Sequence, residues 1–188
     1  MAEGSSGVER ELKFADVDLE TLRDRLEALE AESDGPAALE DNWIFDRDGE
    51  LQRGESVLRL RYDRRGTRLT FKGPARFEGS VKIRSEHETK VEDAAALRDI
   101  LVALGYEPVR RYQKYREEWR LGSLIIALDH TPIGDFVEIE GEGCETVARR
   151  LGLETEDAET RNYLKLYEDY LKEHPGATPD MIFRESED

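Results

Sequence analysis

The chain has 188 residues, which suits one domain with a sizeable hydrophobic core. Charged residues make up 38% of it and its formal net charge is −16, so long-range electrostatics would repel a polyanion such as DNA or RNA. No apolar run approaches the roughly 20 residues that span a bilayer. We therefore expect neither a nucleic acid nor a membrane as a partner.

The scarcity of histidine and cysteine limits the metal chemistry. Three histidines and a single cysteine, Cys144, leave little for a zinc site, so we expect any metal to be a hard ion held by carboxylates. Cys144 has no partner for an internal disulfide, and residues 1–7 have neither the basic nor the apolar region of a signal peptide. These features predict a cytoplasmic protein and leave open whether the chain forms a homodimer.

Eight short stretches alternate apolar and polar side chains with period two, which predicts β-strands. In chain order they span residues 8–14, 42–46, 57–62, 68–72, 81–88, 112–119, 123–128 and 136–140. A strand with one polar face usually turns that face to water. Six of these strands, however, together carry charges of both signs on their polar faces, and such faces can instead line a closed barrel. Eight strands make a barrel wide enough to hold one small ligand.

Leucines and tyrosines at helical spacing predict four amphipathic helices, which we expect to cover the apolar outside of the barrel. They span residues 19–29, 94–104, 146–151 and 160–171. The tail from Glu173 is polar apart from Met181-Ile182-Phe183, a triplet that we expect to dock. The sequence thus predicts one α+β domain over residues 1–188, an eight-stranded antiparallel closed barrel with flanking helices. Its core covers about residues 8–171, and a polar tail covers 173–188.

Two pairs of glutamates suggest a metal site. Glu9 and Glu11 point to the same face of a strand, about 7 Å apart, and Glu138 and Glu140 repeat that spacing near the other end of the chain. Brought together, the two pairs would form an oxygen cage for Mg²⁺ or Mn²⁺. Bases on the polar strand faces would neutralise much of the charge of a triphosphate: Lys13, Arg59, Arg61, Lys72, Arg84, Lys114 and Arg116.

These residues fall in motifs that resemble a known family. Glu9-Arg10-Glu11-Leu12-Lys13 resembles the Glu-x-Glu-x-Lys signature of the CYTH superfamily, the triphosphate tunnel metalloenzymes. Six later segments resemble its remaining motifs in the family's order: residues 58–61, 69–74, 84–88, 112–116, 129–141 and 160–164. In the last of them, Asn162 stands where the family usually has Ser. The family's fold is an eight-stranded antiparallel barrel that forms a tunnel, which agrees with the strands counted above.

The resemblance also implies roles for individual residues. The implied metal ligands are Glu9, Glu11, Glu138 and Glu140, with Asp129 close by. The seven bases and Arg161 would hold phosphates, and Lys13, Arg59, Arg61 and Lys72 would act in catalysis. Glu86 and Glu88 would orient the bases or help to hold a second metal. Lys82, Arg110 and Arg111 are expected to be solvated.

The resemblance implies an enzyme that acts on a small-molecule triphosphate, and two reactions remain open. A triphosphatase would direct water at the terminal phosphorus, whereas a class IV adenylate cyclase would form cyclic AMP and pyrophosphate from ATP. The whole chain, including its tail, resembles proteins labelled as such cyclases. No adenine-reading motif is evident, and Tyr62, Tyr112 and Trp119 are expected on the outward phase, which favours hydrolysis of an inorganic or organic triphosphate. Two alternatives are not enzymes: a polyphosphate-binding module without catalytic activity, and a structural barrel.

Overall fold

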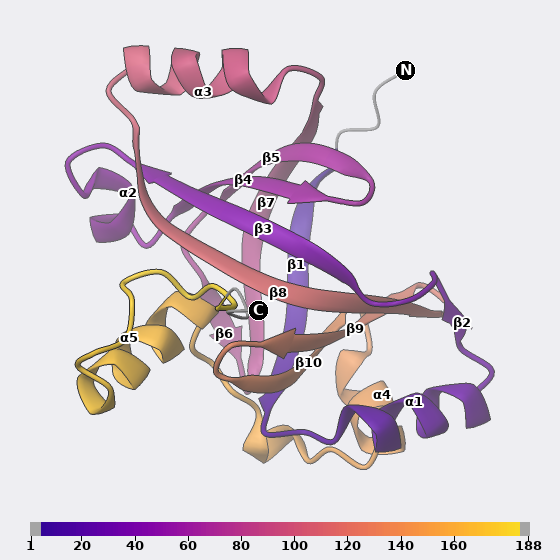
Figure 1. Cartoon of the computed structure of the whole chain (residues 1–188). Coiled ribbons are helices and arrows are strands. Elements are labelled where there is room, and N and C mark those ends of the chain that lie inside the picture. Colours follow the sequence, from indigo (N-terminus) through magenta and orange to yellow (C-terminus); the bar gives the residue numbers. More distant parts are fainter. Residues whose placement is uncertain (1–4, 185–188) are drawn as a thin grey trace.

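The computed structural model describes residues 5–184, which form a closed antiparallel barrel with flanking helices (Figure 1). Eight strands follow one another around it in the order β1-β10-β9-β8-β3-β4-β5-β7, and β7 pairs back with β1 to close the ring. Each of the eight predicted strands is present, which confirms the predicted α+β fold. The strands are β1 (Ser5–Ala15), β3 (Ala38–Asp46), β4 (Val57–Asp63), β5 (Gly66–Lys72), β7 (Val81–Val91), β8 (Glu107–Leu121), β9 (Leu124–Thr131) and β10 (Gly134–Glu140).

Two short strands and six helical segments complete the described chain. The strand β2 (Glu32–Ser33) pairs with β8, and β6 (Arg76–Glu78) pairs with β7. The helical segments are α1 (Leu19–Ala28), α2 (Glu50–Arg53), α3 (Ala94–Ala103), α4 (Cys144–Arg150), the 3₁₀ turn η1 (Thr155–Asp157) and α5 (Tyr163–Glu173). Among residues 5–184, no helix combines the length and the apolar character that a membrane crossing requires.

Period-two alternation explains why the strands close into a barrel. On β1 the apolar Leu12 and Phe14 point outward and are buried. Glu11 and Lys13, which alternate with them, point inward and line the tunnel. The outward side chains pack against α1 and α4, and Leu26 and Leu151 are fully buried there. Each such side chain stabilises the fold by roughly 1.5–3 kcal/mol. Asp18 caps the start of helix α1, and its carboxylate accepts hydrogen bonds from the backbone N–H groups of the first turn.

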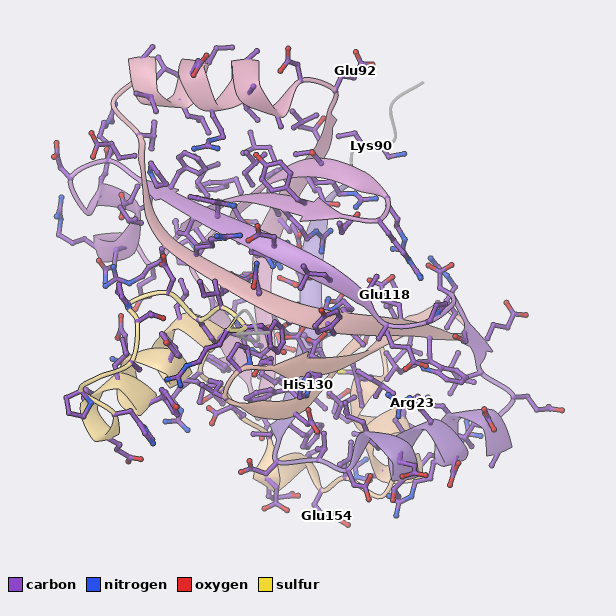
Figure 2. The ribbon with its side chains drawn as sticks, viewed as in Figure 1. Arg23, Lys90, Glu92, Glu118, His130 and Glu154 are labelled. Atoms are coloured by element: carbon purple, nitrogen blue, oxygen red, sulfur yellow. The ribbon has the colours of Figure 1, made fainter. Side chains whose placement is uncertain are left out.

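The other helices cover separate parts of the barrel. Helix α3 lies at the opposite end of the molecule from α1 and α4 (Figure 1), and its Leu101 packs on a cluster beside Phe45 and Leu60. Helix α5 packs beside the tunnel through Tyr163 and Tyr167. Exposed charged side chains such as Glu92 and Glu154 project from the outer surface (Figure 2).

The tail segment docks on the barrel wall, as the sequence predicts. Met181 is 1% exposed, and its backbone N–H donates to the carbonyl of Arg111 at 3.1 Å. Its carbonyl accepts from the N–H of Gln113 at 2.8 Å, so the tail pairs with β8 there. Phe183 packs against the rings of Tyr115 and His130.

Candidate active site

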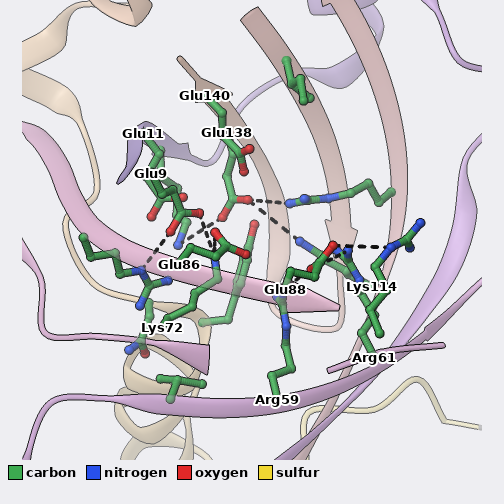
Figure 3. Close-up of a pocket in the computed structure, with 18 of the residues that line it drawn as sticks. Glu9, Glu11, Arg59, Arg61, Lys72, Glu86, Glu88, Lys114, Glu138 and Glu140 are labelled. Carbon is green, nitrogen blue, oxygen red and sulfur yellow. Dashed lines mark hydrogen bonds and ion pairs between the residues drawn. The ribbon is translucent and has the colours of Figure 1, made fainter. Parts of the chain in front are cut away.

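The barrel encloses a cavity of about 300 Å³ whose walls are charged (Figure 3). Seven glutamates and eleven Lys or Arg side chains of the described chain line it. Glu40 and Asp129 do not line the cavity but pair with these bases, so the excess is two positive charges. The whole chain, by contrast, carries a net charge of −16. The local excess inside a low-dielectric wall would attract a small polyanion even though the outside repels one.

Three glutamates come together on one side of this cavity. Strand pairing sets Glu11 opposite Glu140, and period two puts Glu9 on the same face as Glu11. Carboxylate oxygens of these three residues lie within 4.8 Å of one another. Burial and the charge of Glu9 raise the pKa of Glu140 to about 8. Carboxylate oxygens in such a group are the ligands that a hard divalent cation such as Mg²⁺ or Mn²⁺ prefers, so these three residues could hold one. We refer to Glu9, Glu11 and Glu140 as the acidic triad.

The other two acids proposed as metal ligands lie outside the acidic triad and hold bases. Asp129 is fully buried and accepts hydrogen bonds from Lys114 at 2.9 Å and from Arg116 at 2.7 Å. The hydroxyl of Tyr163 also donates to Asp129, at 2.7 Å. Glu138 accepts from Arg116 at 2.5 Å and lies 3.3 Å from Lys13. Burial alone would raise the pKa of Glu138, but Lys114 and Arg116 outweigh it and lower that pKa well below its usual range.

Three bases lie close to carboxylates of the acidic triad. Lys72 donates to Glu9 at 2.6 Å and lies 3.1 Å from Glu86, and Arg84 donates to the second oxygen of Glu9 at 2.9 Å. Burial opposes ionisation of Glu9, yet these two bases lower its pKa to about 2. Lys82 donates to Glu11 at 2.7 Å and is only 9% exposed. The expectation that Lys82 is solvated was therefore wrong.

Arg59 and Arg61 face the acidic triad from the β4 side of the cavity (Figure 3) and are held by longer contacts. Arg59 donates to the hydroxyls of Tyr112 at 3.3 Å and Thr70 at 3.4 Å. Arg61 donates to Glu40 and to Glu88, each at 3.3 Å. Glu88 thus orients Arg61 here, and Glu86 approaches Lys72. Glu40 is a buried tunnel carboxylate that the sequence analysis did not identify.

Two further charged residues lie elsewhere than in the tunnel. Arg161 lines the wider cavity described below, and its exposed guanidinium pairs with Glu159 and Asp169. Only its backbone carbonyl reaches a tunnel residue, since it accepts a hydrogen bond from Lys13 at 3.3 Å. Arg111 was expected to be solvated, yet it donates two hydrogen bonds to Asp41.

Aromatic side chains also enter the tunnel wall. Tyr112 was expected on the outward phase, but it lines the cavity together with Tyr163. Tyr62 and Trp119 do pack on the outer clusters. The ammonium group of Lys13 lies 4.2 Å from the centre of the Tyr163 ring, and that of Lys114 lies 4.9 Å from it. The ring is thus already covered by cations.

A second and wider cavity adjoins one end of the tunnel. It has a volume of about 840 Å³ and shares Lys82 and Arg84 with the tunnel. Its wall includes Phe77 and Val109, which are 47% and 42% exposed. The tunnel therefore opens at this end into a space with apolar as well as charged walls.

Comparisons with known proteins agree with this geometry. The model of the CYTH domain matches residues 7–164. A protein of Methanocaldococcus jannaschii named "Putative adenylate cyclase MJ0240" is 29% identical over 102 residues, which are 54% of this chain and 58% of that protein. The matched part of the chain thus spans less than two thirds of that relative's length.

Two solved structures establish the same fold. A "putative adenylate cyclase" from Vibrio parahaemolyticus has a TM-score of 0.75 at 22% identity, covering 87% of this chain and 99% of that one. "Putative adenylyl cyclase HpAC1" from Hippeastrum, described as having a dominant triphosphatase activity, has a TM-score of 0.54 at 18% identity, covering 90% and 92%. The family model matches most of this chain, and the barrel of the chain closes around the charged cavity described above. The chain therefore belongs to the CYTH domain family.

Proposed function

We propose that this protein is a divalent-metal-dependent triphosphatase that binds its substrate inside the barrel. One observation carries the proposal: cationic side chains surround the closed cavity, and the acidic triad lies on one side of it. A linear triphosphate offers a binding site nothing but phosphate oxygens. A tunnel lined by eleven Lys or Arg side chains can bind such a chain from several sides, and a cation at the acidic triad would add positive charge.

The side chains of the tunnel have separate tasks in this reaction. Arg59 and Arg61 bind non-bridging oxygens, because their present contacts are long and easily exchanged. Lys13 and Lys72 lie closer to the acids and stabilise charge that develops on the leaving phosphate. Glu9, Glu11 and Glu140 would hold the metal, which supplies charge neutralisation and orientation of the phosphates when bound. We assign Asp129 and Glu138 to the positioning of Lys114 and Arg116.

The reaction is a hydrolysis with a simple balance. The oxygen of a water molecule bonds to the terminal phosphorus, and the bridging P–O bond breaks. Its electron pair leaves with the diphosphate part, and the proton of the water passes to solvent. Inorganic triphosphate would thus give one orthophosphate and one pyrophosphate. The Hippeastrum protein, with its described triphosphatase activity, supports the proposal in that the same fold can accommodate this chemistry.

A second candidate is the cyclisation of ATP to cyclic AMP and pyrophosphate. The wide cavity at the tunnel end favours it, since Phe77 and Val109 offer an apolar surface to an organic group. The name of the archaeal relative favours it as well. Inside the tunnel, however, Tyr163 is covered by Lys13 and Lys114, so its ring is not available to stack on a base. We therefore favour hydrolysis.

A product screen tests the choice. Protein with Mg²⁺ or Mn²⁺ is incubated with inorganic triphosphate, thiamine triphosphate or ATP, and orthophosphate, pyrophosphate and cyclic AMP are measured. We expect faster orthophosphate release from inorganic triphosphate than cyclic AMP formation from ATP, and complete loss of both with a chelator. Cyclic AMP and pyrophosphate in equal amounts from ATP, with inorganic triphosphate untouched, would establish the cyclase. Binding of triphosphate without turnover would identify a non-catalytic polyphosphate-binding module.

A further inference from the structure

The wall formed by β3 and β4 contains most of the unpartnered buried polar atoms of the described chain. Six buried side-chain nitrogen or oxygen atoms of residues 5–184 have no hydrogen-bond partner. One belongs to Arg10. The other five are Glu40 Oε2, Asn42 Oδ1 and Nδ2, Arg59 Nε and Arg61 Nε, all on these two neighbouring strands. Two of them lie near an opposite charge, since Glu40 Oε2 is 3.7 Å from Lys114 Nζ and Arg61 Nε is 3.3 Å from Asp63. Buried polar atoms are nearly always paired in native proteins, so this concentration requires an explanation.

Asn42 is the clearest member of this group. Its side chain is fully buried, and both of its amide atoms lack a partner. Strand register sets it opposite Arg61 on β4 and opposite Tyr112 on β8, and both of these line the tunnel cavity. Residues two positions away on the same face also reach the tunnel. Glu40 contacts Arg61, and Ile44 lines the cavity. The amide of Asn42 therefore belongs to the inward face of β3, directly beside the tunnel arginines.

Arg59 and Arg61 make longer contacts than the bases that bind Glu9 and Asp129. The guanidinium contacts of Arg59 and Arg61 with hydroxyls and carboxylates measure 3.3–3.4 Å. These values lie beyond the usual length of a charged hydrogen bond. Each side chain can turn to a phosphate whose charge offsets its present ion pairs, which for Arg61 are those with Glu40, Asp63 and Glu88. Such a turn would bring a phosphate oxygen to the wall on which the Asn42 amide lies.

We propose that Asn42 is a further substrate-binding residue, whose amide Nδ2 donates a hydrogen bond to a phosphate oxygen held by Arg59 and Arg61. The inference rests on the proposed triphosphate function and adds a residue to it. An amide suits this place because it donates a hydrogen bond without carrying negative charge. An aspartate would instead pair with the two arginines and repel the phosphate.

The test measures ligand binding apart from turnover. Asn42→Leu keeps roughly the shape of the side chain and removes both polar atoms. Affinity for inorganic triphosphate is measured by calorimetry with Mg²⁺ present, together with thermal unfolding and steady-state kinetics. We expect binding about 10- to 100-fold weaker, because a hydrogen bond to a charged group is lost. KM should rise by a similar factor with kcat changed little. The melting temperature should stay level or rise, since an unpartnered buried amide has been removed.

Two further variants keep the outcome interpretable. Asn42→Asp places a carboxylate beside Arg59 and Arg61, and we expect it to bind triphosphate more weakly than Asn42→Leu. Gln113→Leu is the matched control, because this amide lies on the opposite face of β8 from the tunnel and accepts a hydrogen bond from the Phe183 N–H at 3.2 Å. It should lower the melting temperature and leave the affinity unchanged.

The outcomes separate this inference from the proposed function. Wild-type affinity in the folded Asn42→Leu protein would overturn the role of Asn42 and leave the triphosphatase proposal standing. An Asn42→Asp protein that binds as tightly as wild type would overturn it as well, and this variant decides if Asn42→Leu does not fold. A wild-type protein that binds no triphosphate would overturn both proposals together.

Discussion

Two walls of the same tunnel use their charges differently. On the side formed by β1, β5, β7, β8, β9 and β10, bases and acids make short pairs, such as Lys72 with Glu9 at 2.6 Å and Lys114 with Asp129 at 2.9 Å. On the β3–β4 wall, Arg59 and Arg61 make hydrogen bonds of 3.3–3.4 Å, and five buried polar atoms lack a hydrogen-bond partner. We infer that the first wall is assembled before a ligand arrives, whereas a ligand would complete the second.

This difference follows from the energetics of buried charge. Removing an ion from water costs several kcal/mol, which only a close partner of opposite sign and good hydrogen bonds can offset. Asp129 meets that condition with three donors. Arg59 and Arg61 meet it only in part. Arg61 lies 3.3 Å from each of Glu40, Asp63 and Glu88. A phosphate could replace such long contacts with shorter, stronger ones.

The largest expected effect is a loss of stability when a paired carboxylate of the first wall is replaced. Asp129→Asn removes the charge that compensates buried Lys114 and Arg116, so we expect a loss of about 3–5 kcal/mol in the free energy of unfolding. Urea denaturation followed by circular dichroism measures it. Arg59→Ala serves as the control from the β3–β4 wall and should change this free energy by less than about 1 kcal/mol. Equal losses in the two variants would show that the walls do not differ.

The fold was predictable because alternation survives on every barrel strand. On β1, for example, Glu9, Glu11 and Lys13 keep one phase and Leu12 and Phe14 the other. The same alternation also indicates two inward positions that the expectations above placed outside the tunnel. Lys82 shares the phase of Arg84, and Tyr112 shares that of Lys114, so both inward positions could have been predicted.

Other features of the site were beyond the reach of periodicity. Arg161 precedes α5 in a segment without a repeat, so nothing in the sequence indicates that its guanidinium pairs with Glu159. Alternation also shows which face a carboxylate occupies but not which base it meets across the barrel. For this reason Asp129 could not be distinguished by sequence from the acids of the triad. Asn42 attracts no attention until the structure shows its amide buried and unpartnered.

A smaller effect is expected from substitutions in the β3–β4 wall, and it concerns the affinity for triphosphate. Arg59→Ala and Arg61→Ala should each weaken binding of inorganic triphosphate by about 1.5–3 kcal/mol, because a charge-assisted hydrogen bond is lost. Calorimetry in the presence of Mg²⁺ measures the change. The fold should survive in both, since the empty tunnel carries an excess of positive charge that these variants reduce. Unchanged affinity in both variants would mean that this wall does not contact the ligand.

The smallest expected effect is the change in stability with pH that the acidic triad causes. The pKa of Glu140 is raised to about 8, because burial and the charge of Glu9 oppose its ionisation. In an unfolded chain a glutamate ionises near pH 4.3. Between these values the folded protein keeps a proton that the unfolded chain has lost. The stabilising contribution is therefore complete below about pH 4.3 and is lost as the pH rises through 8.

Metal-free protein in chelator should lose about 2 kcal/mol of unfolding free energy between pH 6 and pH 8. Glu140→Gln cannot ionise and should flatten this part of the profile. Saturating Mg²⁺ should flatten it in the wild type, because a bound cation favours the ionised carboxylate. Parallel profiles for wild type and Glu140→Gln would assign the slope to other groups, and the acidic triad would no longer be distinguished from the well-paired acids around Asp129.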